Sequence, residues 1–186
     1  ILRVAGTSAD EMRIYGQLVK TASSPALIIG YGSALIRAGR YNEAVERLRE
    51  YVRQEATNAS AIGLLALAQR RAGQRPAAIE TLKTGLAKVE LATRTDLALE
   101  LAQTYEELGR NEEAIAQYEQ AFEYFSGKNV LTPANMPLFS EVVTRLARVC
   151  RRVGNQTKLQ NLLTRTRRLI DEQNSLVDLI SIEGLR

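Results

Sequence analysis

Apolar residues recur at the three- and four-residue spacing of amphipathic helices over most of the chain, and short polar phrases interrupt the pattern. Four of these phrases resemble one another. Each contains a glycine that lies five residues before a small or apolar residue in the next apolar run: Gly39, Gly73, Gly109 and Gly154, spaced by 34, 36 and 45 residues. Glycine ends helices well because it adopts positive φ at little cost. We therefore expect each phrase to be the turn of a helical hairpin, and the spacing to indicate stacked hairpins.

A second regularity surrounds these glycines. The residue seven positions before each one is small and follows a large apolar residue, which gives the pairs Tyr31-Gly32, Leu65-Ala66, Leu101-Ala102 and Leu146-Ala147. After each glycine, a second pair lies one helical turn apart: Ala44 with Leu48, Ala78 with Leu82, Ala114 with Tyr118, and Leu159 with Leu163. Small residues in the first helix permit the close approach of the second, so these offsets predict tightly paired helices.

Together these positions resemble the tetratricopeptide repeat family over roughly residues 24–170. The resemblance implies an all-α fold, a right-handed superhelical solenoid of antiparallel helix hairpins, and a role in binding other proteins. The alternative is an unrelated antiparallel helical bundle with accidental Ala-Gly turns. Independent turns would not keep the same offsets around every glycine, so the pattern favours the solenoid.

The expected repeats occupy residues 24–58, 59–92, 94–127 and 135–174. Residues 1–23 are expected to be a partial, degenerate repeat, because Gly6 lies 33 residues before Gly39 and the residues around the two glycines align. The chain has no initiator methionine. We interpret it as a processed chain or a piece of a longer array.

The end of the third repeat and the end of the chain depart from the period. An insertion loop is expected near 126–136, where Gly127, Pro133 and Pro137 interrupt helix. Such a loop is either functional or a tolerated surface insertion, and both interpretations stay open. A short closing helix is expected at 175–186.

Composition excludes most catalytic chemistry. The chain contains no histidine, no tryptophan and one cysteine, so the usual proton shuttle and most thiol and metal sites are missing. We expect a protein that is not an enzyme and that needs no cofactor. Cys150 lies in the fourth repeat at the position equivalent to Tyr105 of the third, and is expected to be a buried thiol. No apolar stretch is long enough for a membrane span.

Charge is segregated along the chain. The net charge of +4 combines a segment at 96–123, with eight acidic residues and one basic residue, and a segment at 140–170, with eight basic residues and one acidic residue. Opposed fields of this kind govern association and partner choice more than they govern the fold. A partner with an acidic segment would suit the basic part.

In the repeat family that this chain resembles, the first helix of each pair faces the concave surface, so its residues are the candidate binding site. They are Ile29, Ser33, Arg37, Leu67, Arg70, Arg71, Gln103, Arg145, Arg148 and Arg152. The last three follow i, i+3, i+7 spacing on one helix face, which suits recognition of a carboxylate or a phosphate. The alternative for these three is pairing with Glu100, Glu106 and Glu107 of the preceding repeat, or simple solvation.

The favoured function is therefore a protein-binding scaffold or adaptor within a larger protein or assembly. Self-association is an alternative, because the N-terminal edge of a cut array has no cover. RNA binding is disfavoured because the repeat spacing varies, the third repeat is acidic and the basic residues lack interleaved aromatics. The abundance of Arg, Ala and Leu suggests a bacterial source, and the compartment, cytoplasm or periplasm, depends on the parent protein.

Overall fold

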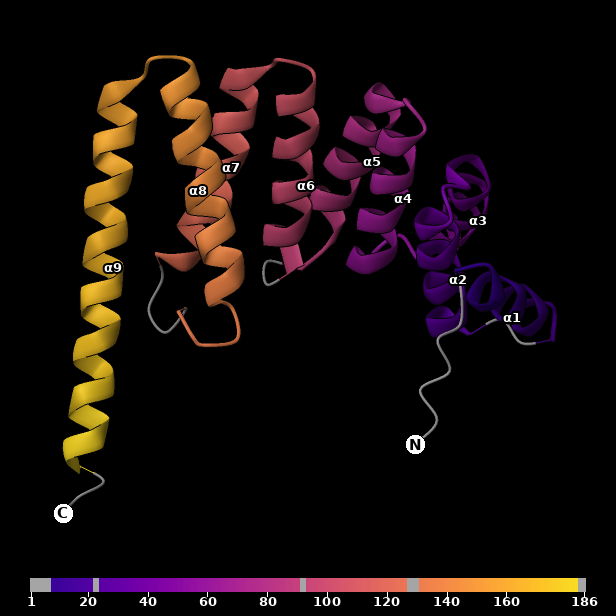
Figure 1. Cartoon of the computed structure of the whole chain (residues 1–186), viewed down its shortest axis with the longest axis horizontal. Coiled ribbons are helices and arrows are strands. Elements are labelled where there is room, and N and C mark those ends of the chain that lie inside the picture. The colour runs from indigo at the N-terminus through magenta and orange to yellow at the C-terminus, as the bar shows by residue number, and fades with distance from the viewer. Residues whose placement is uncertain (1–7, 22–23, 91–92, 127–130, 184–186) are drawn as a thin grey trace. The chain divides into compact units, whose positions relative to one another are not determined.

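Helices make up nearly all of the described backbone. The computed structural model describes residues 8–21, 24–90, 93–126 and 131–183, which form nine helices and no strand (Figure 1). They are α1 (Ser8–Thr21), α2 (Pro25–Arg37), α3 (Tyr41–Gln54), α4 (Ala59–Arg71), α5 (Arg75–Lys88), α6 (Arg94–Glu107), α7 (Asn111–Phe125), α8 (Met136–Arg152) and α9 (Gln156–Glu183). The predicted all-α fold of paired helices is confirmed.

The four turn glycines close α2, α4, α6 and α8 in the same manner. Their φ angles are 75° at Gly39, 79° at Gly73, 70° at Gly109 and 71° at Gly154. The residue after each glycine donates its backbone N–H to the carbonyl five positions earlier, from Arg40 to Leu35, Gln74 to Gln69, Arg110 to Tyr105 and Asn155 to Cys150, at 2.8–2.9 Å. This is the backbone bond of a Schellman motif, which needs a left-handed residue at the glycine position. The repeated phrase in the sequence therefore corresponds to a repeated backbone geometry.

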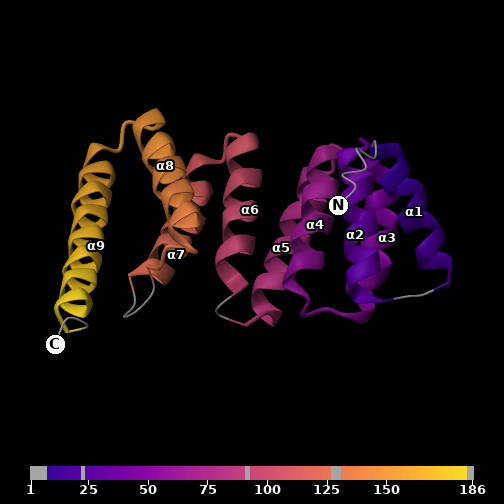
Figure 2. The same ribbon diagram turned by 60° about the horizontal axis from the view of Figure 1, so that its bottom comes forward.

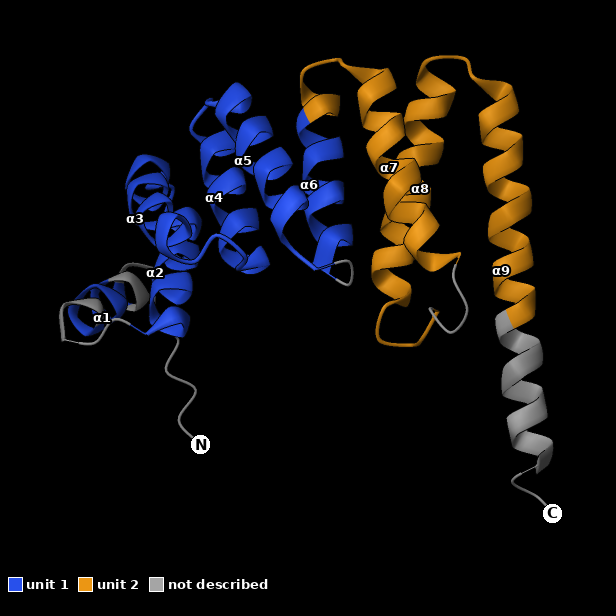
Figure 3. Ribbon diagram, turned by 180° about the vertical axis from the view of Figure 1, so that it is seen from behind, with its two compact units in different colours: residues 1–104 blue, residues 105–186 orange. Residues whose placement is uncertain are grey.

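The chain divides into two compact units, residues 1–104 and residues 105–186, with the boundary inside α6 (Figure 3). In unit 1, each helix from α1 to α4 packs on the next one, and α2 also contacts α4. Figure 2 shows α2, α3 and α4 side by side. In unit 2, α7 packs on α8 and α8 packs on α9.

The core of unit 1 depends on helices that come very close together. Leu35, Val45 and Leu48 are buried with alanines between α2, α3 and α4. A Cβ atom on Gly32 would lie 2.7 Å from Cδ2 of Leu48, which is completely buried. The leucine side chain therefore fills the space that a side chain at 32 would occupy. Complete burial of a leucine contributes about 1.5–3 kcal/mol relative to exposure.

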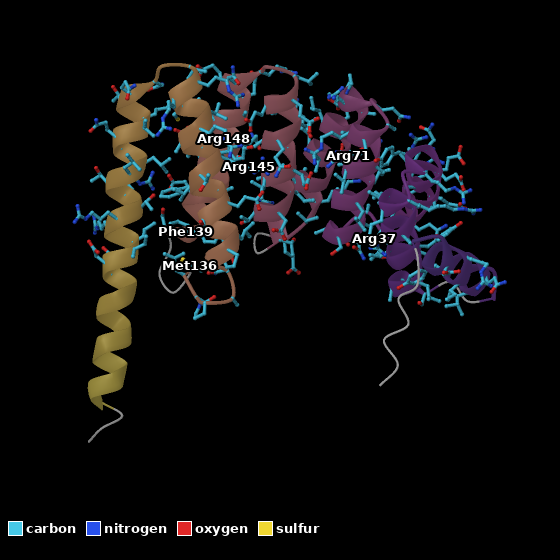
Figure 4. The ribbon with its side chains drawn as sticks, in the orientation of Figure 1. Arg37, Arg71, Met136, Phe139, Arg145 and Arg148 are labelled. Atoms are coloured by element: carbon cyan, nitrogen blue, oxygen red, sulfur yellow. The ribbon has the colours of Figure 1, made fainter. Side chains whose placement is uncertain are left out.

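Unit 2 has an aromatic core where α7 ends and α8 begins. The ring of Phe139 lies 5.9 Å from that of Phe122 and 5.3 Å from that of Phe125, between centroids. All three rings are buried. Figure 4 places Phe139 and Met136 at the start of α8. Aromatic pairs at these separations add to the stabilisation from burial.

The second half of the expected insertion loop is held in place by local contacts. Leu131 is buried, and the backbone N–H of Thr132 donates to the side chain of Asn135 at 2.8 Å. Helix α8 follows at Met136, with Pro137 in its first turn, where no backbone donor is needed. Residues 127–130, within the same expected loop, lie outside the described residues.

The C-terminal helix differs from the expectation. A separate closing helix was expected at 175–186, whereas α9 runs from Gln156 to Glu183 without a break. Neither glycine nor proline occurs between these two residues, so nothing in the sequence ends the helix earlier. Residues 184–186 lie outside the described residues, as do residues 1–7 of the expected partial repeat.

The close approach at Gly32 generates a test with an internal control. Gly32→Ala should destabilise unit 1 by about 1–2 kcal/mol, because overpacking against Leu48 outweighs the gain in helix propensity. Gly63→Ala in α4 is the control, since its new Cβ would meet only Leu97, at 3.6 Å. It should stabilise by about 0.5–1 kcal/mol. Urea denaturation measures both, and stabilisation by Gly32→Ala would contradict the packing described here.

Candidate protein-binding surface

Two matching rows of residues lie on neighbouring helices of unit 1. Ile29, Ser33 and Arg37 follow i, i+4 spacing along α2, and Gly63, Leu67 and Arg71 follow the same spacing along α4, each 34 residues later. Residues four apart share one face of a helix, and α2 and α4 are in contact. We call these six residues the helix-A surface of unit 1.

Local sequence fixes the starts of both helices. Ser24 accepts a hydrogen bond from the backbone N–H of Leu27 at 3.3 Å, and Pro25 occupies the first turn of α2. Asn58 accepts from the N–H of Ala61 at 3.0 Å and caps α4. Such caps contribute about 1 kcal/mol each. They set where the two rows of the helix-A surface begin.

Each row runs from small or apolar residues to an exposed arginine. Ile29, Ser33 and Leu67 are half-buried, whereas Arg37 and Arg71 are exposed at the C-terminal ends of their helices (Figure 4). Arg37 donates a hydrogen bond of 2.9 Å to Ser33. The guanidinium group of Arg71 makes no ion pair or hydrogen bond with any other described residue. The surface therefore offers partly exposed apolar groups beside a cation that is available to a ligand.

Two other residues expected in the groove have a different role. Arg70 is only 8% exposed and pairs with Glu100 at 2.9 Å. It also donates to the side-chain oxygen of Gln103 at 3.1 Å. These contacts join α4 to α6. Arg70 and Gln103 thus serve the packing of unit 1.

The three arginines of α8 do not act together. Arg145 pairs with Glu141 on its own helix at 2.8 Å, and Arg152 pairs with Glu106 at 2.7 Å. Arg148 is exposed, and its guanidinium has no partner among the described residues (Figure 4). Pairing with the preceding repeat, which the sequence left open for all three, occurs at Arg152. Only Arg148 resembles Arg71 in being available.

Glu106 also accepts a hydrogen bond from a buried tyrosine, whose pKa is shifted. The hydroxyl of Tyr118 donates to Glu106 at 3.0 Å. Burial of the ring, together with the negative charge of Glu106, raises the pKa of Tyr118 well above its ordinary value. Tyr118 therefore stays protonated and holds the same carboxylate that Arg152 binds.

The opposed charge segments meet within unit 2. Lys158 pairs with Glu119 at 2.7 Å, and Arg165 binds both oxygens of Glu123 at 2.8 and 2.9 Å. The hydrogen bonds from Arg165 lower the pKa of the Glu123 carboxyl below its ordinary value. Both pairs join α9 to α7. Much of the segregated charge is therefore used inside the unit, although each half-exposed pair contributes only about 0–1 kcal/mol.

The described residues hold no cluster suited to a metal ion. No group of three or more His, Cys, Asp or Glu side chains in this part of the chain is placed to bind one. Cys150 is completely buried, and burial is the main cause of the raised pKa of its thiol. Within the described helices, none is long and apolar enough to cross a membrane.

Comparison with known families agrees with this architecture. Tetratricopeptide repeat models match residues 35–94 and residues 95–126. The chain therefore belongs to the tetratricopeptide repeat family across residues 35–126. No curated protein matches its sequence.

Solved structures share the fold at low sequence identity. A crystal structure of MamA has a TM-score of 0.67 and 19% identity, covering 93% of this chain and 94% of that chain. The type III secretion translocator chaperone SycD of Yersinia enterocolitica has a TM-score of 0.59 and 15% identity, covering 74% of this chain and 93% of that chain. PcrH has a TM-score of 0.57 and 16% identity, covering 80% of this chain and 98% of that chain.

Neighbouring arginines in α4 allow the packing role and the surface role to be separated. Arg70→Ala should cost about 2 kcal/mol of unfolding free energy, because it removes charge-assisted hydrogen bonds and leaves the partly buried carboxylate of Glu100 without this partner. Arg71→Ala should change stability by less than about 0.5 kcal/mol. Chemical denaturation followed by circular dichroism measures both. Equal losses would show that Arg71 also belongs to the core.

Proposed function

We propose that this chain is a non-catalytic protein-binding module that holds a segment of a partner protein on the helix-A surface of unit 1. The observation that supports it most directly is the exposed Arg71, whose guanidinium has no partner among the described residues, one turn after the half-buried Leu67. A buried or paired arginine would offer nothing to a ligand. This one offers a charge beside an apolar contact.

The chemistry of the surface favours a particular kind of segment. The row on α2 presents Ile29 and Ser33, and the row on α4 presents Gly63 and Leu67, so small apolar side chains fit alongside both helices. Arg37 and Arg71 lie at the end of each row and favour a carboxylate there. The ligand is therefore a segment with aliphatic side chains followed by an acidic residue. In unit 2, Arg148 is a separate candidate for contact with acidic groups.

Structures with the same fold are compatible with this role. PcrH was crystallised with the chaperone binding region of PopD, and SycD is a type III secretion translocator chaperone. At this low sequence identity, the likeness shows the fold alone. The chemistry of the proposed ligand segment is therefore inferred from residues of this chain. The role of an adaptor within a larger protein or assembly rests on the same proposal.

Selection of peptide ligands tests the proposal while the partner is unidentified. Peptides selected from a random phage-displayed library against the whole chain should combine aliphatic and acidic residues. Arg71→Glu should weaken their binding about tenfold, which corresponds to about 1.4 kcal/mol. Fluorescence anisotropy with a synthetic copy of the selected peptide measures the affinity.

A matched variant controls for the change of charge. Arg47→Glu replaces an exposed arginine of α3 that is outside the helix-A surface, and its guanidinium also has no partner among the described residues. It should leave peptide affinity within about twofold of the parent. Equal loss in both variants, or no effect of Arg71→Glu, would rule out the helix-A surface as the binding site.

Exposed apolar residues on the terminal helices favour self-association as a second candidate. On α1, Ile14 and Leu18 are 49% and 42% exposed and share one face. On α9, Leu163 and Ile170 are 55% and 38% exposed. Contact between α9 of one copy and α1 of another would cover both pairs.

Sedimentation at several concentrations tests this second candidate. The parent chain should associate as concentration rises, and the double change Leu163→Gln with Ile170→Gln should abolish association by removing the apolar contact. Leu108→Gln, at an exposed leucine between α6 and α7, is the control and should have no effect. A parent chain that is monomeric at every concentration would exclude self-association through α1 and α9.

A further inference from the structure

A cleft with a volume of about 470 Å³ lies between α3 and α5, the second helices of two successive hairpins of unit 1. Its two walls are the C-terminal halves of α3 and α5, and residues of α4 form its floor. None of its lining residues belongs to the helix-A surface. The cleft is therefore a separate feature of the same unit.

Three of the residues that line the cleft on α5 are small. Thr81, Thr84 and Gly85 line it on α5, at 8, 11 and 12 positions after the turn glycine Gly73. The corresponding residues of the preceding repeat are Arg47, Glu50 and Tyr51, and those of the following repeat are Gln117, Gln120 and Ala121. At these three positions, the side chains of the second repeat are thus the smallest among the three well-formed repeats.

Gly85 also brings α5 unusually close to α4. A Cβ atom at this position would lie 2.6 Å from Cγ2 of Ile62. The floor of the cleft is apolar, with Ile62 and Leu65 from α4 and the half-buried Val52 from α3 along one side. One aliphatic side chain of a ligand would find apolar contacts on several sides there.

The rim of the cleft is basic. Arg49, Arg53 and Lys88 are exposed around it, against one acidic lining residue, Glu80. None of these four side chains has an ion pair or hydrogen bond with another described residue. In unit 2, by contrast, Lys158 and Arg165 are paired with glutamates. The rim charges therefore remain available to a ligand of opposite sign.

We propose that this cleft is a second binding site, which takes an acidic peptide segment of a partner protein and seats one aliphatic side chain of that segment between α3 and α5. Charge complementarity selects the acidic flanks, and the small wall at Thr81 and Thr84 admits the anchor. No aromatic side chain is among the described residues that line the cleft, where it could stack a nucleobase, so a peptide suits the site better than a nucleic acid. The site is independent of the helix-A surface proposed above.

A defined peptide tests the site on the whole chain. The probe is acetyl-Asp-Glu-Leu-Glu-Asp-amide, followed by amide chemical shifts of the isotopically labelled protein at physiological salt. Saturable shifts are expected in residues 49–56 and 80–88. A peptide with serine in place of leucine should bind at least about fivefold more weakly, because the anchor is lost.

Charge variants with the same net change separate the rim from the general field of the protein. Arg53→Glu combined with Lys88→Glu should weaken probe binding at least tenfold. Arg47→Glu combined with Lys83→Glu alters exposed residues of the same two helices outside the cleft, and should change it less than twofold. Screening over about 8 Å at physiological salt makes this contrast measurable.

Filling the cleft tests the anchor without a change of charge. Thr81→Gln combined with Thr84→Gln introduces the residues that the third repeat carries at these positions, and glutamine favours helix more than threonine does. The variant should fold normally and should bind the leucine and serine peptides equally weakly. Retained preference for the leucine peptide would overturn the proposal.

Other results would also overturn it. Absence of saturable shifts at 49–56 and 80–88 would mean that the cleft takes no acidic peptide. Equal shifts with inorganic phosphate or a short single-stranded RNA would mean that the rim is a general anion patch. Shifts confined to α2 and the Leu67 face of α4 would assign the probe to the helix-A surface, and would leave that proposal standing while refuting this one.

Discussion

The approach of paired helices at positions with little or no side chain is the constraint on which the rest of unit 1 depends. Leu48 of α3 occupies the space that a Cβ atom on Gly32 would need. Ile62 does the same at Gly85. Because both contacts are tight and buried, the two helices of each hairpin have little freedom to slide. This packing fixes how the helix-A surface and the cleft between α3 and α5 are oriented within unit 1.

The fold could be predicted from the sequence because its determinants are local and repeated. The positive φ angles at positions 39 and 73 favour glycine there. The small and apolar residues at fixed distances from these glycines can be recognised in the sequence. The end of α9 could not be predicted as well. Its apolar residues beyond 174 suggested a separate element, whereas the absence of a helix-breaking residue allowed the helix to continue to Glu183.

The candidate site was predicted less completely, because periodicity identifies a helix face but not the partners of its side chains. Arg70 and Arg71 are adjacent, and both were predicted from the sequence to be groove residues. One is directed to Glu100 across the contact between α4 and α6, and the other is exposed. Adjacent residues of a helix lie about 100° apart around its axis, so Arg70 faces α6 and Arg71 does not. Which side of α4 the helix α6 covers is a property of tertiary packing. Comparison of the repeats shows that Thr81, Thr84 and Gly85 are small. Only the structure shows that these residues line a cleft.

The fit of Leu48 against Gly32 also bears on how arrays of this kind change during evolution. The other repeats have alanine at the position of Gly32, opposite Leu82, Tyr118 or Leu163 in the place of Leu48. A hairpin copied as a whole keeps both halves of its fit. A recombination within the turn would instead join an alanine-bearing first helix of another repeat to α3, where Leu48 fills the space that a Cβ atom at this position would need. The pair of α2 and α3, with its turn, is therefore better duplicated or exchanged as a whole than in halves.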